Sequence, residues 1–176
     1  MKESQDLTSE RWRMECGSGH EATPLIDQVE AIYNKLEISA NPRQYGQLYR
    51  ARVLLACDYG HGQDCLRYAK LEIEQEQVRA DREGGLTGEL AISNNNMAMA
   101  YAYCGEYSKA IPFLQMSIEI RQKLPGFKRF NLYSPLVHLG VVYNYLGRNN
   151  EAVEILTTAL EDRQRELGPD DRVSIR

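Results

Sequence analysis

The sequence predicts an all-α fold made of consecutive helical hairpins, and three observations support this prediction. An internal pattern repeats every 42 residues along most of the chain. Within each repeat, apolar and small residues recur at spacings of three and four, which places them on one side of a helix. Glycine then follows the first helix of two repeats, where a chain that leaves a helix often adopts a positive φ.

The repeat is clearest in two stretches, which start near Ala91 and Tyr133. Their matched residues are Met97, Ala98, Tyr101, Gly105, Ala110, Leu114 and Ser117 in one stretch, and Leu139, Gly140, Tyr143, Gly147, Ala152, Leu156 and Ala159 in the other. Another step of 42 residues towards the N-terminus reaches Ala56 and indicates a third repeat that starts near Tyr49. Ala69 then falls one residue late, which we interpret as one insertion in the turn that precedes it.

The chain before the first repeat is predicted to hold one more amphipathic helix. Thr23 and Pro24 suit an N-cap and the first turn of a helix. An apolar stripe follows and ends at Asn41 and Pro42; its members are Ile26, Val29, Tyr33 and Leu36. We therefore expect a flexible N-terminal segment at 1–22, a capping helix or degenerate repeat at 23–40, three repeats within 43–172, and a C-terminal end at 173–176.

The repeated residues resemble the tetratricopeptide repeat, and the 42-residue period is similar to the kinesin-light-chain subtype of that family. The phrases that carry the resemblance are Asn94–Ala98, Ser117–Lys123, Ala159–Arg163 and Leu167–Asp171. Similar arrays occur in many fungal proteins, some of them attached to a nucleotide-binding switch domain. The resemblance implies a right-handed α-solenoid whose first helices line a concave groove for a peptide or protein segment, and it implies no chemistry.

Composition excludes several kinds of partner. The chain has 21 basic and 25 acidic residues and a formal charge of -4, so it lacks the basic excess that binding to a phosphate backbone requires. No apolar run approaches the roughly 20 residues that cross a bilayer. Residues 1–6 are not a positively charged lead into an apolar signal segment. We therefore expect a cytoplasmic protein that binds neither nucleic acid nor membrane.

Cysteine and histidine spacing raises the hypothesis of a zinc site. Cys57, His61 and Cys65 lie four residues apart, and Cys16 and His20 repeat the same spacing. The paired Cys-x-x-Cys of a closed structural site is absent, and free cysteine commonly packs as a small apolar residue. We therefore predict no metal ligand, and less than one zinc ion per chain.

A catalytic thiol is a second hypothesis, with Cys57 or Cys65 as nucleophile and His61 or His138 as base. The sequence supplies no glycine-rich phosphate loop, no recognisable oxyanion hole and no carboxylate pair with an evident difference in pKa. We therefore predict no catalytic residue, no cofactor and no enzymatic activity.

The face of the first helices that lies away from the repeated tyrosines is the predicted partner-binding groove. Its candidate residues are Asn95, Asn96, Met99, Tyr103, His138, Val141, Asn144 and Tyr145. Asparagine is a poor helix former that can both donate and accept hydrogen bonds, so a peptide-contact role explains the run at 94–96. Such asparagines also accompany the kinesin-light-chain subtype, which leaves inheritance without a contact role as the alternative. The residue set of the two-carboxylate clamp in chaperone-binding relatives is missing.

The function that we predict is a non-enzymatic scaffold or adaptor that binds a protein segment. The alternatives are a remnant or subunit of a larger receptor or sensor, and an accessory factor of a biosynthetic pathway. The 42-residue period predicts a fourth repeat at 175, and the sequence stops at Arg176. We therefore expect self-association or partner docking through an uncapped C-terminal edge. The apolar residues expected to form this edge are Val153, Leu156, Leu160 and Leu167.

Overall fold

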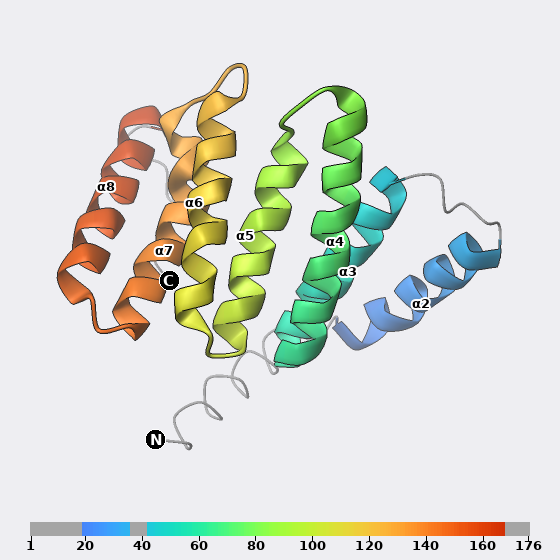
Figure 1. Cartoon of the computed structure of the whole chain (residues 1–176). Coiled ribbons are helices and arrows are strands. Elements are labelled where there is room, and N and C mark those ends of the chain that lie inside the picture. Colours follow the sequence, from blue (N-terminus) through green and yellow to red (C-terminus); the bar gives the residue numbers. More distant parts are fainter. Residues whose placement is uncertain (1–18, 36–41, 168–176) are drawn as a thin grey trace. The chain divides into compact units, whose positions relative to one another are not determined.

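The computed structural model describes residues 19–35 and 42–167, and every regular element within these ranges is helical (Figure 1). The α-helices are α2 (Gly19–Lys35), α3 (Pro42–Asp58), α4 (Gly62–Glu83), α5 (Gly88–Tyr103), α6 (Tyr107–Lys123), α7 (Tyr133–Tyr145) and α8 (Asn149–Leu167). A short 3-10 helix, Arg129–Leu132, precedes α7. The predicted all-α fold of consecutive hairpins is confirmed. None of the described helices is long and apolar enough to span a membrane.

The chain divides into two compact units, Met1–Gly85 and Leu86–Arg176. In the described part of the first unit, α3 and α4 pair as a hairpin and α2 packs against α3. The second unit holds two hairpins, α5 with α6 and α7 with α8, and α6 also packs against α7. In this second unit the order of packing therefore follows the order of the sequence, as it does in a repeat array.

The three hairpins turn in the same way. In each turn the backbone N–H of the third residue after α3, α5 or α7 donates to the carbonyl five residues earlier, and a glycine of positive φ directly precedes this donor. The pairs are His61 N to Ala56 O at 2.8 Å, Glu106 N to Tyr101 O at 2.9 Å and Arg148 N to Tyr143 O at 2.9 Å. The glycines are Gly60, Gly105 and Gly147, with φ of 68°, 76° and 75°. The positive φ predicted at Gly105 and Gly147 is confirmed.

The structure corrects the register of the first repeat. Its turn lies 45 residues before the next one, counted from His61 to Glu106, whereas the later two turns are 42 residues apart. Helix α4 has 22 residues against the 17 of α6, and α5 has 16 against the 13 of α7, whereas the connection after α4 is shorter than the one after α6. Cys65 rather than Ala69 therefore corresponds to Ala110. The predicted turn insertion is wrong, because a shift of three residues keeps nearly the same face of a helix and leaves the apolar pattern almost unchanged.

Helix α2 begins at Gly19, four residues before Thr23, so Pro24 lies inside the helix instead of in its first turn. Proline has no backbone N–H, so it cannot donate the usual hydrogen bond within a helix. The residues before Pro24 are helical all the same. Helix α3 begins at Pro42, before the repeat start that we expected near Tyr49. The predictions for residues 1–18, which include Cys16, lie outside the described residues.

Small residues let the helices of the second unit pack closely. Its core cluster contains Ala98, Ala110, Leu114, Leu139, Val142, Tyr143 and Ala152. Gly140 is the tightest point, because a Cβ atom built there would lie 2.6 Å from Cγ of Leu156. A side chain at this position requires Leu156 or the helix that carries it to move.

Candidate functional site

The eight predicted groove residues all lie in the second unit, on the first helices of its two hairpins. Helix α5 carries Asn95, Asn96, Met99 and Tyr103, and helix α7 carries His138, Val141, Asn144 and Tyr145. Spacings of three, four and seven place most members of each set on one face of their helix. We call these eight residues the α5–α7 strip.

One hydrogen bond joins the two halves of the strip directly. Nδ1 of His138 lies 2.9 Å from Oδ1 of Asn95, across 43 residues of sequence. The amide oxygen accepts, so Nδ1 carries the proton and donates. Burial lowers the pKa of His138 below its usual value of 6.5, which favours the uncharged ring. The structure thus brings together one residue from each helix of the predicted groove.

The asparagine run at 94–96 divides into side chains with different surroundings. Asn94 is buried, and its Nδ2 donates to the carbonyl of Leu90 at 2.8 Å, one turn earlier in the same helix. Asn95 is only 7% exposed, so it lies mostly beneath the surface that we expected it to line. Asn96 is half-buried. Asn94 is therefore a structural residue, while Asn96 is more accessible than Asn95.

Aromatic side chains form the C-terminal end of the strip. Tyr145 is 61% exposed, and its ring stacks on that of Tyr107 with centroids 4.6 Å apart and an interplanar angle of 3°. Tyr103 is also exposed. Sequence reasoning missed Tyr107, the first residue of α6, because nothing in the repeat pattern links it to a residue 38 positions away.

The remaining members give the strip a neutral character. Val141 is exposed, Asn144 is exposed and Met99 is half-buried. The strip contains no aspartate, glutamate, lysine or arginine. Since the pKa of His138 is lowered as well, the strip presents amide, aliphatic and aromatic groups but no formal charge near neutral pH.

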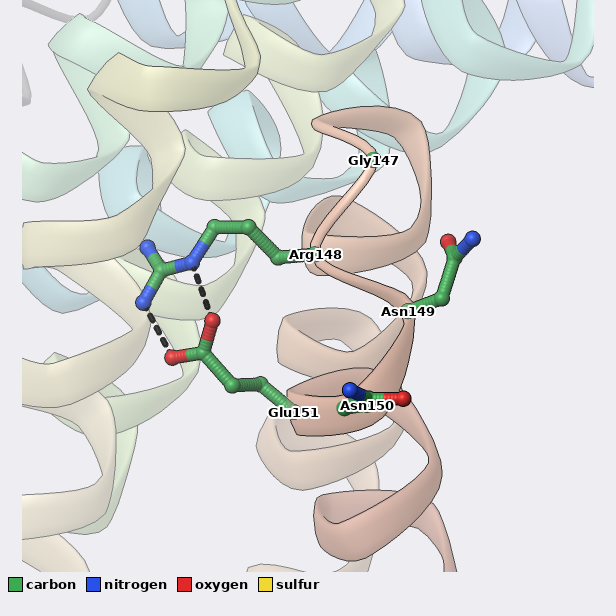
Figure 2. A pocket seen from close by; sticks show the side chains of 5 residues that line it. All are labelled: Gly147, Arg148, Asn149, Asn150 and Glu151. Carbon is green, nitrogen blue, oxygen red and sulfur yellow. Dashed lines mark hydrogen bonds and ion pairs between the residues drawn. The ribbon is translucent and has the colours of Figure 1, made fainter.

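A shallow pocket at the N-terminus of α8 lies apart from the α5–α7 strip residues. Figure 2 shows the five residues that line it, Gly147, Arg148, Asn149, Asn150 and Glu151. Arg148 donates from Nε to Glu151 at 2.6 Å and forms a second, parallel bond from Nη2. This pairing lowers the pKa of Glu151. The charges of the pocket neutralise each other, so the pocket offers no net charge to a ligand.

The cysteine and histidine residues of the metal hypothesis come only partly together. Sγ of Cys57 lies 2.8 Å from Sγ of Cys65, while Nδ1 of His61 is 3.9 Å from a carboxylate oxygen of Asp64. Within the described residues, no group of three histidine, cysteine or acidic side chains is placed to hold a metal ion. The side chain of His20 is not among those described.

Comparison with known proteins identifies the repeats. The family model for the tetratricopeptide repeat matches residues 90–126 and 136–172, which correspond to the second and third hairpins. The predicted resemblance to tetratricopeptide repeats is confirmed for these residues. No curated protein matches the chain.

Two solved structures are similar to the chain. One is the crystal structure of BtubC (BKLC) from P. vanneervenii, which is 18% identical, with 93% of this chain and 81% of that chain covered and a TM-score of 0.48. The other, from Podosopora anserina, contains nearly identical TPR-like repeats of a putative kinesin light chain; it is 20% identical, with coverages of 93% and 95% and a TM-score of 0.45.

Proposed function

We propose that this chain, which carries tetratricopeptide repeats at residues 90–126 and 136–172, is a non-enzymatic module that binds a protein segment along the α5–α7 strip. Tetratricopeptide repeats in general serve as protein-interaction scaffolds. The observation that carries the proposal is the hydrogen bond between Asn95 and His138, which links the two first helices at adjoining positions. An extended segment that lies across this link contacts both helices at once.

The chemistry of the strip indicates the kind of segment that it binds. Asparagine side chains offer both a donor and an acceptor, which suits the alternating groups of a peptide backbone. Tyrosine supplies a large contact area and a polar hydroxyl with few rotatable bonds. Because the strip carries no formal charge, we propose a segment recognised by its backbone and by apolar side chains, rather than a phosphorylated or strongly acidic one.

No reaction is part of this proposal. A general base in a nucleophilic mechanism needs a hydroxyl or thiol within hydrogen-bond reach. Nδ1 of His138 faces the amide oxygen of Asn95, which is not a nucleophile. The bonded pair is better suited to fixing the shape of a contact surface than to moving a proton.

Peptides selected from a random display library on the full chain provide the ligands for a test by titration calorimetry. Loss of a buried hydrogen bond costs about 1–3 kcal/mol, so Asn96→Ala is expected to weaken binding by roughly five- to a hundredfold. The double change Tyr103→Ala, Tyr145→Ala is expected to weaken binding as well. The melting temperature of Asn96→Ala is expected to stay nearly that of the wild type.

The matched control is Gln115→Ala, an exposed polar residue of α6 outside the strip. It is expected to leave affinity unchanged. If Asn96→Ala and the double tyrosine variant both bind with wild-type affinity, the strip is not the binding surface and the proposal fails.

A further inference from the structure

The first hairpin brings two thiols into contact. Cys57 is the last residue but one of α3, and Cys65 lies in the first turn of α4. Their sulfur atoms are 2.8 Å apart. Cys65 is fully buried, whereas Cys57 is partly exposed. Cys57 is therefore the member of the pair that a small reagent can approach, and its sulfur contacts that of the buried Cys65.

The distance between the sulfur atoms distinguishes between two kinds of thiol chemistry. Two thiolates on one tetrahedral zinc ion, each about 2.3 Å from the metal, lie about 3.8 Å from each other. A disulfide bond brings sulfur atoms to about 2.05 Å. The observed 2.8 Å is too short for two ligands of one zinc ion and needs only a small movement to reach a covalent bond.

We propose that Cys57 and Cys65 are a redox modification site, at which a reversible disulfide fastens the end of α3 to the start of α4. The oxidant is a low-molecular-mass disulfide of the oxidised glutathione class. A small dithiol of the same compartment reverses the reaction. The site lies in the first unit and does not depend on the α5–α7 strip.

The reaction balances as two thiol–disulfide exchanges. The Cys57 thiolate attacks one sulfur of the oxidant, the S–S bond of the oxidant breaks, and the first thiolate leaves and takes up the proton lost by Cys57. Cys65 then loses its proton and attacks the Cys57 sulfur of the mixed disulfide. The protein S–S bond forms, and the second small thiol leaves with that proton. Two protein thiols are oxidised and one small disulfide is reduced to two thiols.

The other two hairpins have no such pair at these positions. Counted from the hairpin turn, the residues that correspond to Cys57 and Cys65 are Ala102 and Ala110 in the second hairpin, and Asn144 and Ala152 in the third. Oxidation therefore acts on the first hairpin alone. A covalent link across a short turn restricts the unfolded chain and raises the resistance of that hairpin to unfolding.

The sequence allows a direct test on the full chain. Trypsin cleaves after Arg52 and Arg67, so the peptide Val53–Arg67 contains both Cys57 and Cys65 but neither Cys16 nor Cys104. The native chain is incubated in a series of glutathione redox buffers, remaining thiols are alkylated, and the peptide is weighed by mass spectrometry. We expect a form two hydrogens lighter than the dithiol and without alkylation, which dithiothreitol converts to the doubly alkylated form.

Proximity in the fold is tested by a comparison with the chain in guanidinium chloride. Because the native structure holds the thiols together, the native chain is expected to form the disulfide more readily than the denatured chain. The ratio of oxidised to reduced glutathione that the native chain needs is expected to be at least about tenfold lower than the ratio that the denatured chain needs. A matched variant, Cys104→Ser, is expected to behave like the wild type. In Cys57→Ser, Cys65 is expected to stay unmodified before unfolding and alkylation, because it is buried.

Two results would overturn the proposal. One is that the peptide from the native chain stays doubly alkylated at glutathione ratios at which the peptide from the denatured chain is already oxidised. The other is oxidation that appears only as glutathione adducts, with no internal bond. Neither result depends on whether a variant folds, because both are measured on the wild-type chain.

Discussion

At the residue scale, one buried position of the second helix, at the same distance from the turn in each hairpin, holds a different kind of side chain in each of the three hairpins. Glu72 of α4 is 0% exposed, and Nε of Arg50, from α3, donates to its Oε1 at 2.8 Å. At the equivalent distance from the turn, the second hairpin has Ser117, whose Oγ donates to the carbonyl of Ala91 at 2.7 Å. The third has Ala159, which needs no partner. Only the first hairpin therefore depends on a charged pair in its interior at this position.

Replacing Arg50 by methionine tests this dependence. Arg50 is 23% exposed, so its pair with Glu72 is largely shielded from water, and removing Arg50 takes the positive charge away from a buried carboxylate. We expect the free energy of unfolding of the first unit to fall by roughly 3–5 kcal/mol, measured by urea denaturation followed by circular dichroism.

The control for this variant is Lys123→Met, which breaks an exposed ion pair with Glu119 and is expected to cost less than about 1 kcal/mol. A second change, Glu72→Leu, is expected to restore much of the stability lost in Arg50→Met, because it removes the buried charge. Equal, small effects of Arg50→Met and Lys123→Met would contradict a stabilising role of the buried pair.

At the element scale, the approach of α7 to α8 depends on the absence of a side chain at one position. Gly140 lies within α7 and is buried, and Leu156 of α8 fills the space in front of it. Ala98 holds the corresponding place in α5, so the second hairpin already carries a methyl group there.

A larger residue at Gly140 is expected to force these two helices apart. Overpacking of a core typically costs about 1–3 kcal/mol, and Gly140→Leu is expected to reach or exceed this range and to unfold the third hairpin. Thermal denaturation measured by circular dichroism tests the prediction. Gly140→Ala is expected to destabilise less, and a further Leu156→Ala change is expected to recover part of the loss.

The control is Gly88→Ala, because a Cβ atom at Gly88 meets only Leu124 at an ordinary 3.9 Å. This substitution is expected to be neutral or slightly stabilising, since alanine favours a helix more than glycine does. If Gly140→Leu melts at the wild-type temperature, the close approach of α7 and α8 is not needed for stability.

At the scale of the whole molecule, one apolar stripe on α8 differs from its counterpart on α6. Ile111, Leu114 and Ile118 of α6 belong to or pack against the core that also contains residues of α7. The residues 42 positions later on α8 are all exposed; they are Val153, with 65% of its surface accessible, Leu156 and Leu160. The apolar stripe that packs against the core on α6 is therefore exposed to solvent on α8.

We expect this open stripe to support self-association, with a second copy of the chain covering it. Exposed apolar patches commonly mark interaction surfaces. Sedimentation velocity over a range of concentrations is expected to show a dimer or larger species whose fraction rises with concentration. Leu160→Glu is expected to abolish that species, because it places a charge in the interface.

Thr157→Glu, an exposed residue of α8 outside the stripe, serves as the control for added charge and is expected to leave association unchanged. A wild-type chain that stays monomeric at the highest concentration, with no difference from Leu160→Glu, would rule out association through this stripe. The predicted contribution of Leu167 lies outside the side chains that the structure describes.

The amino-acid sequence by itself determined those features that depend on neighbours in the chain. The glycine turns at Gly105 and Gly147 were predictable because a positive φ and a hydrogen bond over five residues are local properties. The helices were predictable because their apolar periodicity is local as well. The sequence likewise placed the eight strip residues on one face, of which Tyr103, Val141, Asn144 and Tyr145 are exposed, but no local signal indicated their partners.

Tertiary structure alone decided which side chains meet and which are covered. The contacts of Asn95 with His138 and of Tyr107 with Tyr145 join residues about 40 positions apart, and the sequence pattern does not encode them. The burial of Glu72 was equally hidden, since a glutamate in a helix is ordinarily on its exposed face. The 45-residue first interval escaped detection because a three-residue shift leaves the helical pattern nearly unchanged. In each case, the position of a second helix determines the surroundings of a residue on the first.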